Sequence, residues 1–253
     1  MLEPAQTDID IWLVDDREVA DPDLLDAYRE LLNPEETARH QRFIFTRHRH
    51  QFLVSRALVR CVLGQYLDCA PATVEFSHNR HGKPQVVADP GLQFNLTHTN
   101  GLIALAVTKR APVGIDLEYL SRQADIVKLA SRYFADEENR ALYRLPVAAW
   151  NQRFYDLWTL KEAYLKACGT GLTTPLSDFS FTFGKQGIGI GFSGTIAVDP
   201  AHWQFWLLDA PGTFRLSVAV NDPAAQPYTL NPKMGIPMGE FRPLVLPAAA
   251  FAQ

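Results

Sequence analysis

The sequence predicts an α+β protein made of two segments that each run from helices into strands. Its 253 residues, 47% of them hydrophobic, are enough for one large domain or for two halves of about 110 residues. Apolar residues recur at helical intervals in residues 47–67 and 149–167, and strand-like alternation follows each stretch. We expect a first half at 1–113, a second half at 114–222 and a Pro- and Ala-rich extension at 223–253.

The first segment opens with the alternating stretch "IDIWLV", which predicts a strand at residues 9–14. A helix is expected at 23–32, and Pro34 can begin the next one. In residues 47–67 the apolar positions form one helix face and leave the arginines on the other. Strands separated by turn residues follow in "PATVEFSHNRHGKPQVV" and "LQFNLTHTNGLIALAVTKRAPVGIDLEYL".

The second segment repeats this order. Helices are predicted at 124–134, 136–145 and 149–167, and Gly169 and Gly171 can close the last of them. Strands are predicted in "FSFTF", "GIGIGFSGTIAV", "HWQFWLLDA" and "FRLSVAV". From residue 221 onward the Pro- and Ala-rich composition indicates an irregular tail.

Composition argues against several classes of protein. The net charge of -4 disfavours non-specific binding to nucleic acid or to an anionic membrane. No apolar run is long enough to span a membrane, and the acidic N-terminus does not resemble a signal peptide, so we expect a cytoplasmic location. The three cysteines are odd in number and lack CxxC spacing, which indicates reduced thiols. Neither a phosphate-binding P-loop, a dinucleotide fingerprint, a zinc-ligand pattern nor a serine-hydrolase motif is present.

Basic residues gather in residues 37–67, which contain no Asp or Glu. Two readings are open for this segment: a solvated helix face or a binding site for an anion. The cationic side chains concerned are Arg39, Arg42, Arg47, Arg49, Arg56 and Arg60, accompanied by His40, His48 and His50.

Two carboxylates stand two residues apart in "VGIDLEYL". On a strand, Asp116 and Glu118 point to one face, while Ile115 and Leu117 point to the other. An exposed strand face would explain this pattern. Neighbouring carboxylates are also tolerated when a cation lies between them, and Mg²⁺ prefers such oxygen ligands.

A third carboxylate lies in "WTLKEAYLKACGTGL". Glu162 and Lys166 are one helical turn apart and share a face with Trp158. Taken alone, this is an ordinary surface pair worth about 0.3 kcal/mol. Together with the acids of the strand and the basic segment, it indicates a site for a metal-bound, phosphate-rich ligand.

Two motifs resemble the signatures of the 4'-phosphopantetheinyl transferases, in their larger Sfp-type subgroup. The motifs are "VGID" at 113–116 and "WTLKEAYLK" at 158–166, and both fit the family patterns without a mismatch. "HGKP" at 81–84 and "FNLTHT" at 94–99 are similar to the family's coenzyme A contact segments. The resemblance covers about residues 34–183.

The resemblance implies a reaction: transfer of the phosphopantetheine arm of coenzyme A to a serine of an apo acyl or peptidyl carrier protein, with release of 3',5'-ADP. Asp116, Glu118 and Glu162 would hold Mg²⁺ on the pyrophosphate. Glu162 would also accept the proton of the carrier serine, and Lys166 would stabilise or protonate the leaving phosphate. Lys161, about 100° round the helix from Glu162, is grouped with these catalytic residues as a flanking charge.

The resemblance also implies a set of coenzyme A contacts. His98 and Thr97 would meet a phosphate, Lys83 beside Pro84 would meet the nucleotide end, and Arg39 would clamp the 3'-phosphate. Family members often carry an arginine where this chain has Gln51, so Arg49 or Arg56 is expected to compensate. Asp116, Lys161 and Lys166 complete the expected coenzyme A contacts.

The family fold consists of two similar α/β halves related by a pseudo-twofold, with coenzyme A in the cleft between them. The resemblance therefore implies a monomer that binds coenzyme A and an apo carrier protein. Two alternatives are a carrier-binding module without catalysis, which would be expected to lose Asp116, Glu162 or Lys166, and a magnesium-dependent phosphodiester hydrolase, which would use water in place of a carrier serine.

Overall fold

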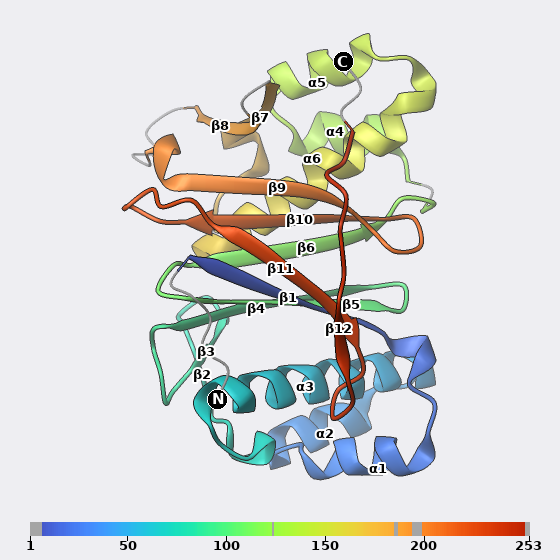
Figure 1. Ribbon diagram of the computed structural model, residues 1–253. Coiled ribbons are helices and arrows are strands. Elements are labelled where there is room, and N and C mark those ends of the chain that lie inside the picture. Colours follow the sequence, from blue (N-terminus) through green and yellow to red (C-terminus); the bar gives the residue numbers. More distant parts are fainter. Residues whose placement is uncertain (1–6, 123, 185–186, 194–198, 251–253) are drawn as a thin grey trace. The chain divides into compact units, whose positions relative to one another are not determined.

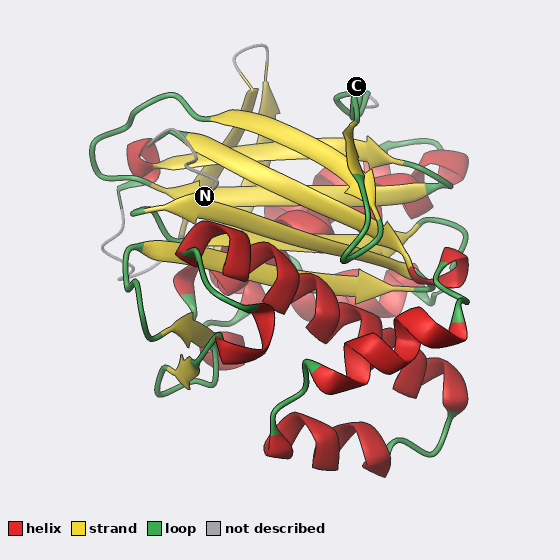
Figure 2. Ribbon diagram, turned by 60° about the horizontal axis from the view of Figure 1, so that its bottom comes forward, coloured by secondary structure: helices red, strands yellow, loops and turns green. Residues whose placement is uncertain are grey.

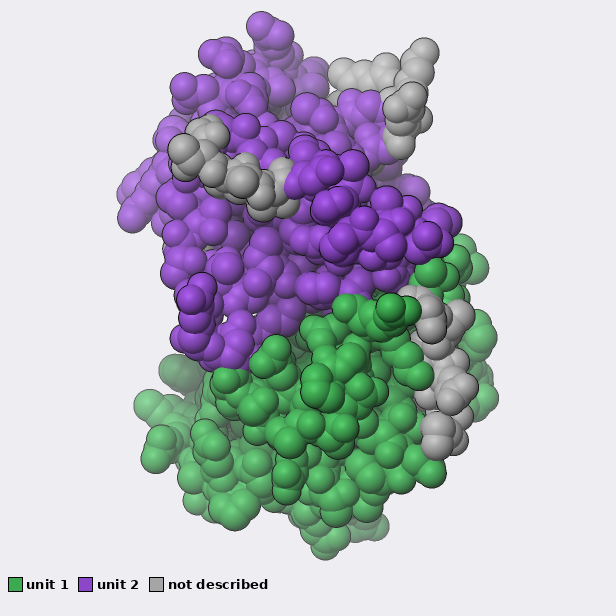
Figure 3. Space-filling model, turned by 90° about the vertical axis from the view of Figure 1, so that its left-hand side faces the viewer, with its two compact units in different colours: residues 1–78, 84–110, 229–245 green, residues 79–83, 111–228, 246–253 purple. Residues whose placement is uncertain are grey.

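The computed structural model describes residues 7–122, 124–184, 187–193 and 199–250. Along the chain, runs of helices are followed by runs of strands (Figure 1), and the α+β class is confirmed. The chain divides into two compact units (Figure 3): unit 1 comprises 1–78, 84–110 and 229–245, and unit 2 comprises 79–83, 111–228 and 246–253. No helix within the described residues is long and apolar enough to cross a membrane.

Unit 1 contains three helices and seven strands among its described residues. The helices are α1 (Pro22–Glu30), α2 (Pro34–Arg42) and α3 (Thr46–Leu67). The strands are β1 (Asp8–Asp15), β2 (Phe76–His78), β3 (Pro84–Val86), β4 (Leu92–Thr99), β5 (Leu102–Lys109), β11 (Thr229–Gly235) and β12 (Phe241–Pro243). The main sheet has the order β12-β11-β1-β5-β4, and β2 pairs with β3.

Helix α3 packs on the sheet of unit 1 because both present apolar faces. Alternate residues of β1 and β5, such as Trp12, Val14 and Leu105, join the core with Leu58 and Leu63 of α3. Figure 2 shows this long helix running beside the strands. Helix α2 begins at Pro34 after a capping box, in which Asn33 and Glu36 each accept a hydrogen bond from the backbone of the other.

Unit 2 is built from α4 (Ile126–Tyr133), α5 (Asp136–Arg144) and α6 (Val147–Cys168), with five strands. The strands are β6 (Val113–Tyr119), β7 (Phe179–Gly184), β8 (Gly187–Phe192), β9 (Trp203–Ala210) and β10 (Phe214–Asn221). The sheet has the order β6-β10-β9, and β7 pairs with β8. The predicted strand "GIGIGFSGTIAV" forms β8, whereas its residues 194–198 lie outside the described residues.

The two units repeat the same order of elements, which confirms the expectation of two similar halves. Apart from β11 and β12, which join unit 1 from the far end of the chain, each begins with a strand, continues through three α-helices of which the last has 22 residues, and ends with four strands among the described residues. In each, the first strand pairs antiparallel with the last, and the last pairs antiparallel with the strand before it: β1-β5-β4 in unit 1 and β6-β10-β9 in unit 2.

The expected irregular tail is instead partly a strand, and this expectation is wrong. β11 pairs in parallel with β1 from Asp8↔Thr229 to Leu13↔Met234, and Tyr28 donates a hydrogen bond to the carbonyl of Pro237 at 2.7 Å. Composition did not predict this strand, because its pairing depends on the backbone edge of β1, which is more than 200 residues away in sequence.

Gly114 allows α6 to approach β6 closely. A Cβ on Gly114 would lie 2.0 Å from the carbonyl oxygen of Ala163 and 2.5 Å from the amide nitrogen of Ala167, distances that no real methyl group tolerates. Gly114 and Asp116 lie on the same face of β6. The close contact therefore brings the helix over the face of the sheet that carries Asp116.

We expect Gly114→Ala to lower the free energy of unfolding by at least about 2 kcal/mol, because the added methyl would force the α6 backbone away from β6. Gly191→Ala is the matched control, since its Cβ would lie 3.6 Å from Ser180 Oγ, an ordinary contact. Urea unfolding measures both. Equal stabilities of the two variants would contradict the prediction.

Candidate active site

Asp116 and Glu118 lie on one face of β6, as the sequence predicts. Asp116 is buried and Glu118 is half-buried, and β10 places Ser217 opposite Asp116 and Arg215 opposite Glu118. Since α6 covers this face, the two carboxylates are held between a strand and a helix.

Helix α6 brings Lys166 to Asp116. The Lys166 Nζ donates to Asp116 Oδ1 at 2.6 Å and to the carbonyl of Ile115 at 3.2 Å. Because Glu162 lies one turn earlier on α6, its side chain shares this face of the helix. Residues 50 positions apart in sequence thus form one charged group in unit 2.

Glu118 and Glu162 of this group resist ionisation. The pKa of Glu118 is raised to about 7, mainly by burial and also by the charges of Asp116 and Glu162, while Arg122 and Lys166 oppose the shift. Burial also raises the pKa of Glu162; the Asp116 charge adds to the effect and Lys166 opposes it. The carboxylates therefore repel one another, and additional positive charge would stabilise their ionised forms.

The donor chemistry of this group fits a divalent cation. Three carboxylates supply the hard oxygen ligands that Mg²⁺ prefers, and the raised pKa values of Glu118 and Glu162 indicate a deficit of positive charge. The three carboxylates do not form a closed metal-binding cluster in this structure: among the described residues, no group of three or more His, Cys, Asp or Glu side chains is arranged to hold an ion. In this arrangement Lys166 supplies the cation at Asp116.

Lys161 lies in the core of unit 2 and not in this charged group. Its Nζ is fully buried, forms an ion pair with Glu138 at 2.8 Å, and donates to the carbonyls of Leu176 and Phe179. Burial lowers the pKa of Lys161, and Glu138 opposes that shift. The expected flanking charge therefore ties α5 and the segment before β7 to α6.

Lys83 contacts the C-terminal end of α6. Its Nζ donates to the carbonyls of Ala167 at 3.3 Å and Val113 at 3.1 Å, and burial lowers the pKa of Lys83 to about 8. In the same turn, Asn79 donates to the carbonyl of Gly169 at 2.8 Å. Lys83 thus satisfies backbone carbonyls of α6 and β6 in unit 2.

The remaining expected coenzyme A contacts belong to unit 1. Arg39 and Arg49 are exposed on α2 and α3. The Arg39 guanidinium lies over the ring of Phe52 at 5.3 Å, and Arg49 donates to the carbonyl of Phe43 at 2.7 Å.

The second half of α3 holds its arginines inside unit 1. Arg56 forms an ion pair with Glu36 and lies over the ring of Phe76 at 4.9 Å. Arg60 is 1% exposed and also pairs with Glu36, at 2.8 Å. Of the two interpretations left open for this segment, a solvated helix face does not hold at Arg60, because its guanidinium pairs with Glu36 and donates to backbone carbonyls of residues 71–74.

The strands of unit 1 hold the other expected contacts. In β4, His98 is exposed and Thr97 is buried, since neighbouring strand residues face opposite sides, and Pro84 opens β3. Gln51, which stands where family members often carry an arginine, is buried. Burial raises the pKa of Asp16, and the Gln51 side chain opposes that shift.

The sequence reasoning missed a buried polar row beneath the charged group. Arg215 Nε lies 2.7 Å from Asp156 Oδ1, and Ser217 donates to Thr159 Oγ1 at 2.7 Å. Arg215 and Ser217 alternate in "FRLSVAV" as Asp116 and Glu118 do in "VGIDLEYL". This alternation of polar residues in an apolar strand was the available signal.

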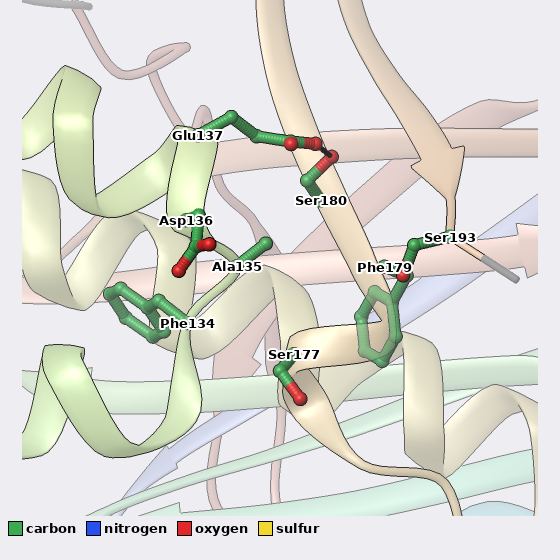
Figure 4. Close-up of a pocket in the computed structure, with 8 residues that line it drawn as sticks. All are labelled: Phe134, Ala135, Asp136, Glu137, Ser177, Phe179, Ser180 and Ser193. Atoms are coloured by element: carbon green, nitrogen blue, oxygen red, sulfur yellow. Dashed lines mark hydrogen bonds between the residues drawn. The ribbon is translucent and has the colours of Figure 1, made fainter.

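The charged group is separate from the cavities identified in the units. A cavity of about 270 Å³ in unit 2 lies between α5 and the β7 strand (Figure 4), where Ser180 donates to Glu137 at 2.5 Å. A second cavity, of about 640 Å³, lies in unit 1 beside Cys61, Cys69 and Met238. None of the expected site residues lines either cavity.

Two family models match this chain. The model of the 4'-phosphopantetheinyl transferase superfamily matches residues 112–219, and that of the 4'-phosphopantetheinyl transferase N-terminal region matches residues 21–110. The boundary between the matches falls just before β6, where the second run of helices and strands begins.

Curated relatives carry the same family name. The 4'-phosphopantetheinyl transferase HetI of Nostoc sp. is 42% identical over 56% of this chain and 61% of its own length. A putative 4'-phosphopantetheinyl transferase of Synechocystis sp. is 33% identical over 66% of this chain and 67% of its own length. Sfp of Bacillus subtilis is 28% identical over 63% of this chain and 70% of its own length. The chain thus spans less than two thirds of HetI and about two thirds of the other two.

Solved structures of smaller proteins match in part. Holo-[acyl-carrier-protein] synthase of Thermotoga maritima has a TM-score of 0.38 and 22% identity, over 44% of this chain and 62% of that one. The Bacillus anthracis synthase in complex with CoA (3',5'-ADP) has a TM-score of 0.35 and 21% identity, over 44% of this chain and 94% of that one.

The class of protein follows from the sequence matches: the two runs of the same element order are each matched by a model of the same family, and the Synechocystis relative is 33% identical over 67% of its own length. The chain belongs to the 4'-phosphopantetheinyl transferase family.

We expect Glu118→Gln to change the pH dependence of stability in metal-free buffer. Because the folded pKa of Glu118 lies above its unfolded value, the folded state holds more protons between about pH 4.5 and 7, and stability falls as the pH rises through that window. Near pH 4 the variant and wild type should be equally stable. At pH 8 the variant should be more stable by about 1 kcal/mol after allowance for solvent screening.

Urea unfolding at several pH values in the presence of EDTA tests this expectation. A difference between Glu118→Gln and wild type that stays constant from pH 4 to pH 8 would contradict it.

Proposed function

We propose that the protein transfers the 4'-phosphopantetheine arm of coenzyme A to a serine hydroxyl of an apo acyl or peptidyl carrier protein, with a divalent cation and with release of 3',5'-ADP. The observation that carries this proposal is the contact of Lys166 with Asp116, in one unit with two further carboxylates of raised pKa. The names of the relatives support the same reaction.

In this reaction the carrier serine Oγ attacks the phosphorus that bears the pantetheine arm, and the P–O bond to the adenosine phosphate breaks. The serine proton goes to a base. We assign this role to Glu162, because burial and the Asp116 charge raise its pKa and make its carboxylate a stronger base near neutral pH. Lys166 is assigned to the leaving phosphate, since its ammonium is the cation at the charged group.

Asp116, Glu118 and Glu162 would hold the divalent cation. Mg²⁺ supplies charge neutralisation on the pyrophosphate when it is bound. Asp116 then has two tasks in this chain: it orients the Lys166 ammonium through the 2.6 Å contact and offers carboxylate oxygen to the cation. Burial raises the pKa of Glu118 to about 7, so added positive charge would stabilise its ionised form.

We further propose that the exposed basic side chains of unit 1 bind the phosphates of coenzyme A. Arg39, Arg49 and His98 are exposed and belong to the segments expected to do so. Arg56 and Lys83 are committed to packing contacts within their own units, so the proposal assigns them a supporting role. Thr97 precedes His98 in β4, and Pro84 opens β3.

We expect Glu162→Ala to slow transfer by at least about 100-fold, because the reaction loses its base and a carboxylate of the metal site. Mass spectrometry of an apo carrier, incubated with coenzyme A and Mg²⁺, measures the addition of one phosphopantetheine arm. Glu240→Gln is a control at an exposed carboxylate, where the rate should not change. An undiminished rate in Glu162→Ala would overturn the assignment. Release of nucleotide from coenzyme A without a carrier would indicate a hydrolase instead.

We expect EDTA to abolish transfer and Mg²⁺ to restore it, because the carboxylates then lack the cation that offsets their repulsion. The same mass assay, run across Mg²⁺ concentrations, should show that Glu118→Gln needs about 10-fold more Mg²⁺ for half-maximal rate. Full activity in EDTA would exclude the metal from the proposal and leave the transfer itself standing.

A further inference from the structure

Helix α6 contacts its sheet through a row of polar pairs. At one end, Asp156 pairs with Arg215 of β10 at 2.7 Å. One turn later, Thr159 accepts a hydrogen bond from Ser217 of β10 at 2.7 Å. Two turns further on, Lys166 donates to Asp116 of β6 at 2.6 Å. The third pair belongs to the candidate active site, and the first two lie beneath it.

The Thr159–Ser217 pair is sealed from solvent. Both side chains are 0% exposed. The Ser217 hydroxyl donates to Thr159 Oγ1, and the Thr159 hydroxyl donates in turn to the carbonyl of Tyr155 at 2.8 Å. This chain of hydrogen bonds joins β10 to the backbone of α6.

The pair lies next to both sides of the site. Ser217 is the direct cross-strand neighbour of Asp116 in the β6–β10 ladder. Thr159 is three residues before Glu162, so the two side chains lie on adjacent turns of the same helix face. A shift of Thr159 along β10 would therefore move Glu162 and Lys166 relative to Asp116 by a similar distance.

Apolar packing alone leaves such a shift open. Dispersion and burial are non-directional, and Gly114, Ala163 and Ala219 offer small, smooth surfaces at the contact between helix and sheet. A hydrogen bond prefers a narrow range of distance and angle, and its loss leaves a buried hydroxyl without an acceptor. The Thr159–Ser217 pair thus favours one register of α6 on the sheet.

We propose that Thr159 and Ser217 are positioning residues that hold Glu162 and Lys166 of α6 against Asp116. This inference rests on the proposed function, because it concerns how α6 holds the side chains to which that function assigns the metal, the serine proton and the leaving phosphate. Neither side chain touches the reacting groups in the proposed reaction. Both act through the placement of the helix, as residues behind metal ligands commonly do.

Affinity for Mn²⁺, measured by electron paramagnetic resonance of the free ion, tests the proposal without a turnover assay. Thr159→Val keeps the shape and removes the hydroxyl, and it should weaken Mn²⁺ binding about 10-fold. Thr159→Ser keeps the hydroxyl and should bind as wild type does. Ser217→Ala preserves the hydrogen bond from Thr159 to Tyr155, so it is the milder variant if Thr159→Val does not fold.

Thr108→Val in unit 1 is the matched control. Thr108 is also 0% exposed, and its hydroxyl donates to the carbonyl of Asp8 at 2.7 Å. This control should be destabilised to a similar degree in urea and should bind Mn²⁺ with wild-type affinity. In the double variant Thr159→Val/Ser217→Ala, the loss of Mn²⁺ binding free energy should be less than the sum of the two single losses, because both substitutions remove the same Ser217–Thr159 hydrogen bond.

Wild-type Mn²⁺ affinity in folded Thr159→Val and Ser217→Ala would overturn the proposal, and so would the absence of Mn²⁺ binding by the wild type. Failure of the proposed function would give a different result. The wild type would bind Mn²⁺ and the Thr159→Val variant would bind it more weakly, yet the wild type would transfer no phosphopantetheine arm to any apo carrier.

Discussion

The contact between α6 and the strands β6 and β10 is the constraint on which the candidate active site depends. Gly114 lets the helix backbone reach the sheet, and hydrogen bonds and ion pairs along the same helix face set its register. Asp116 of β6 and Lys166 of α6 meet only because the two elements are packed at this distance. A site assembled from a strand and a helix is therefore as precise as the packing between them.

Neighbouring residues of α6 show two ways of placing a charge in a protein interior. Lys161 is fully buried, but Glu138 and two backbone carbonyls satisfy its ammonium, so it contributes to packing. Glu162, the next residue, lies near another carboxylate. Burial and the charge of Asp116 raise the pKa of Glu162, and Lys166 offsets this effect only in part. Such incomplete compensation is typical of sites that bind a charged ligand.

The same order of elements carries different charged side chains in the two units. In unit 1 the long helix α3 and the preceding α2 carry basic side chains, some exposed and some paired with Glu36. In unit 2 the corresponding first strand and long helix carry the carboxylates and Lys166. The antiparallel pairing β1-β5-β4 of unit 1 corresponds to β6-β10-β9 of unit 2, so within this shared part the difference in chemistry lies in the side chains.

Patterns in the sequence predict the class of fold, the two helix-to-strand runs and the identity of the charged residues. Local periodicity specifies an amphipathic helix or a strand, and the spacing of Asp116 and Glu118, or of Glu162 and Lys166, follows from the repeat of each element. Tertiary structure alone decided which charges meet. It turned Lys161 and Arg60 inward, paired the Pro-rich tail with β1, and joined Thr159 to Ser217. These contacts connect residues far apart in sequence, and no local pattern encodes the distance between two elements once they have packed.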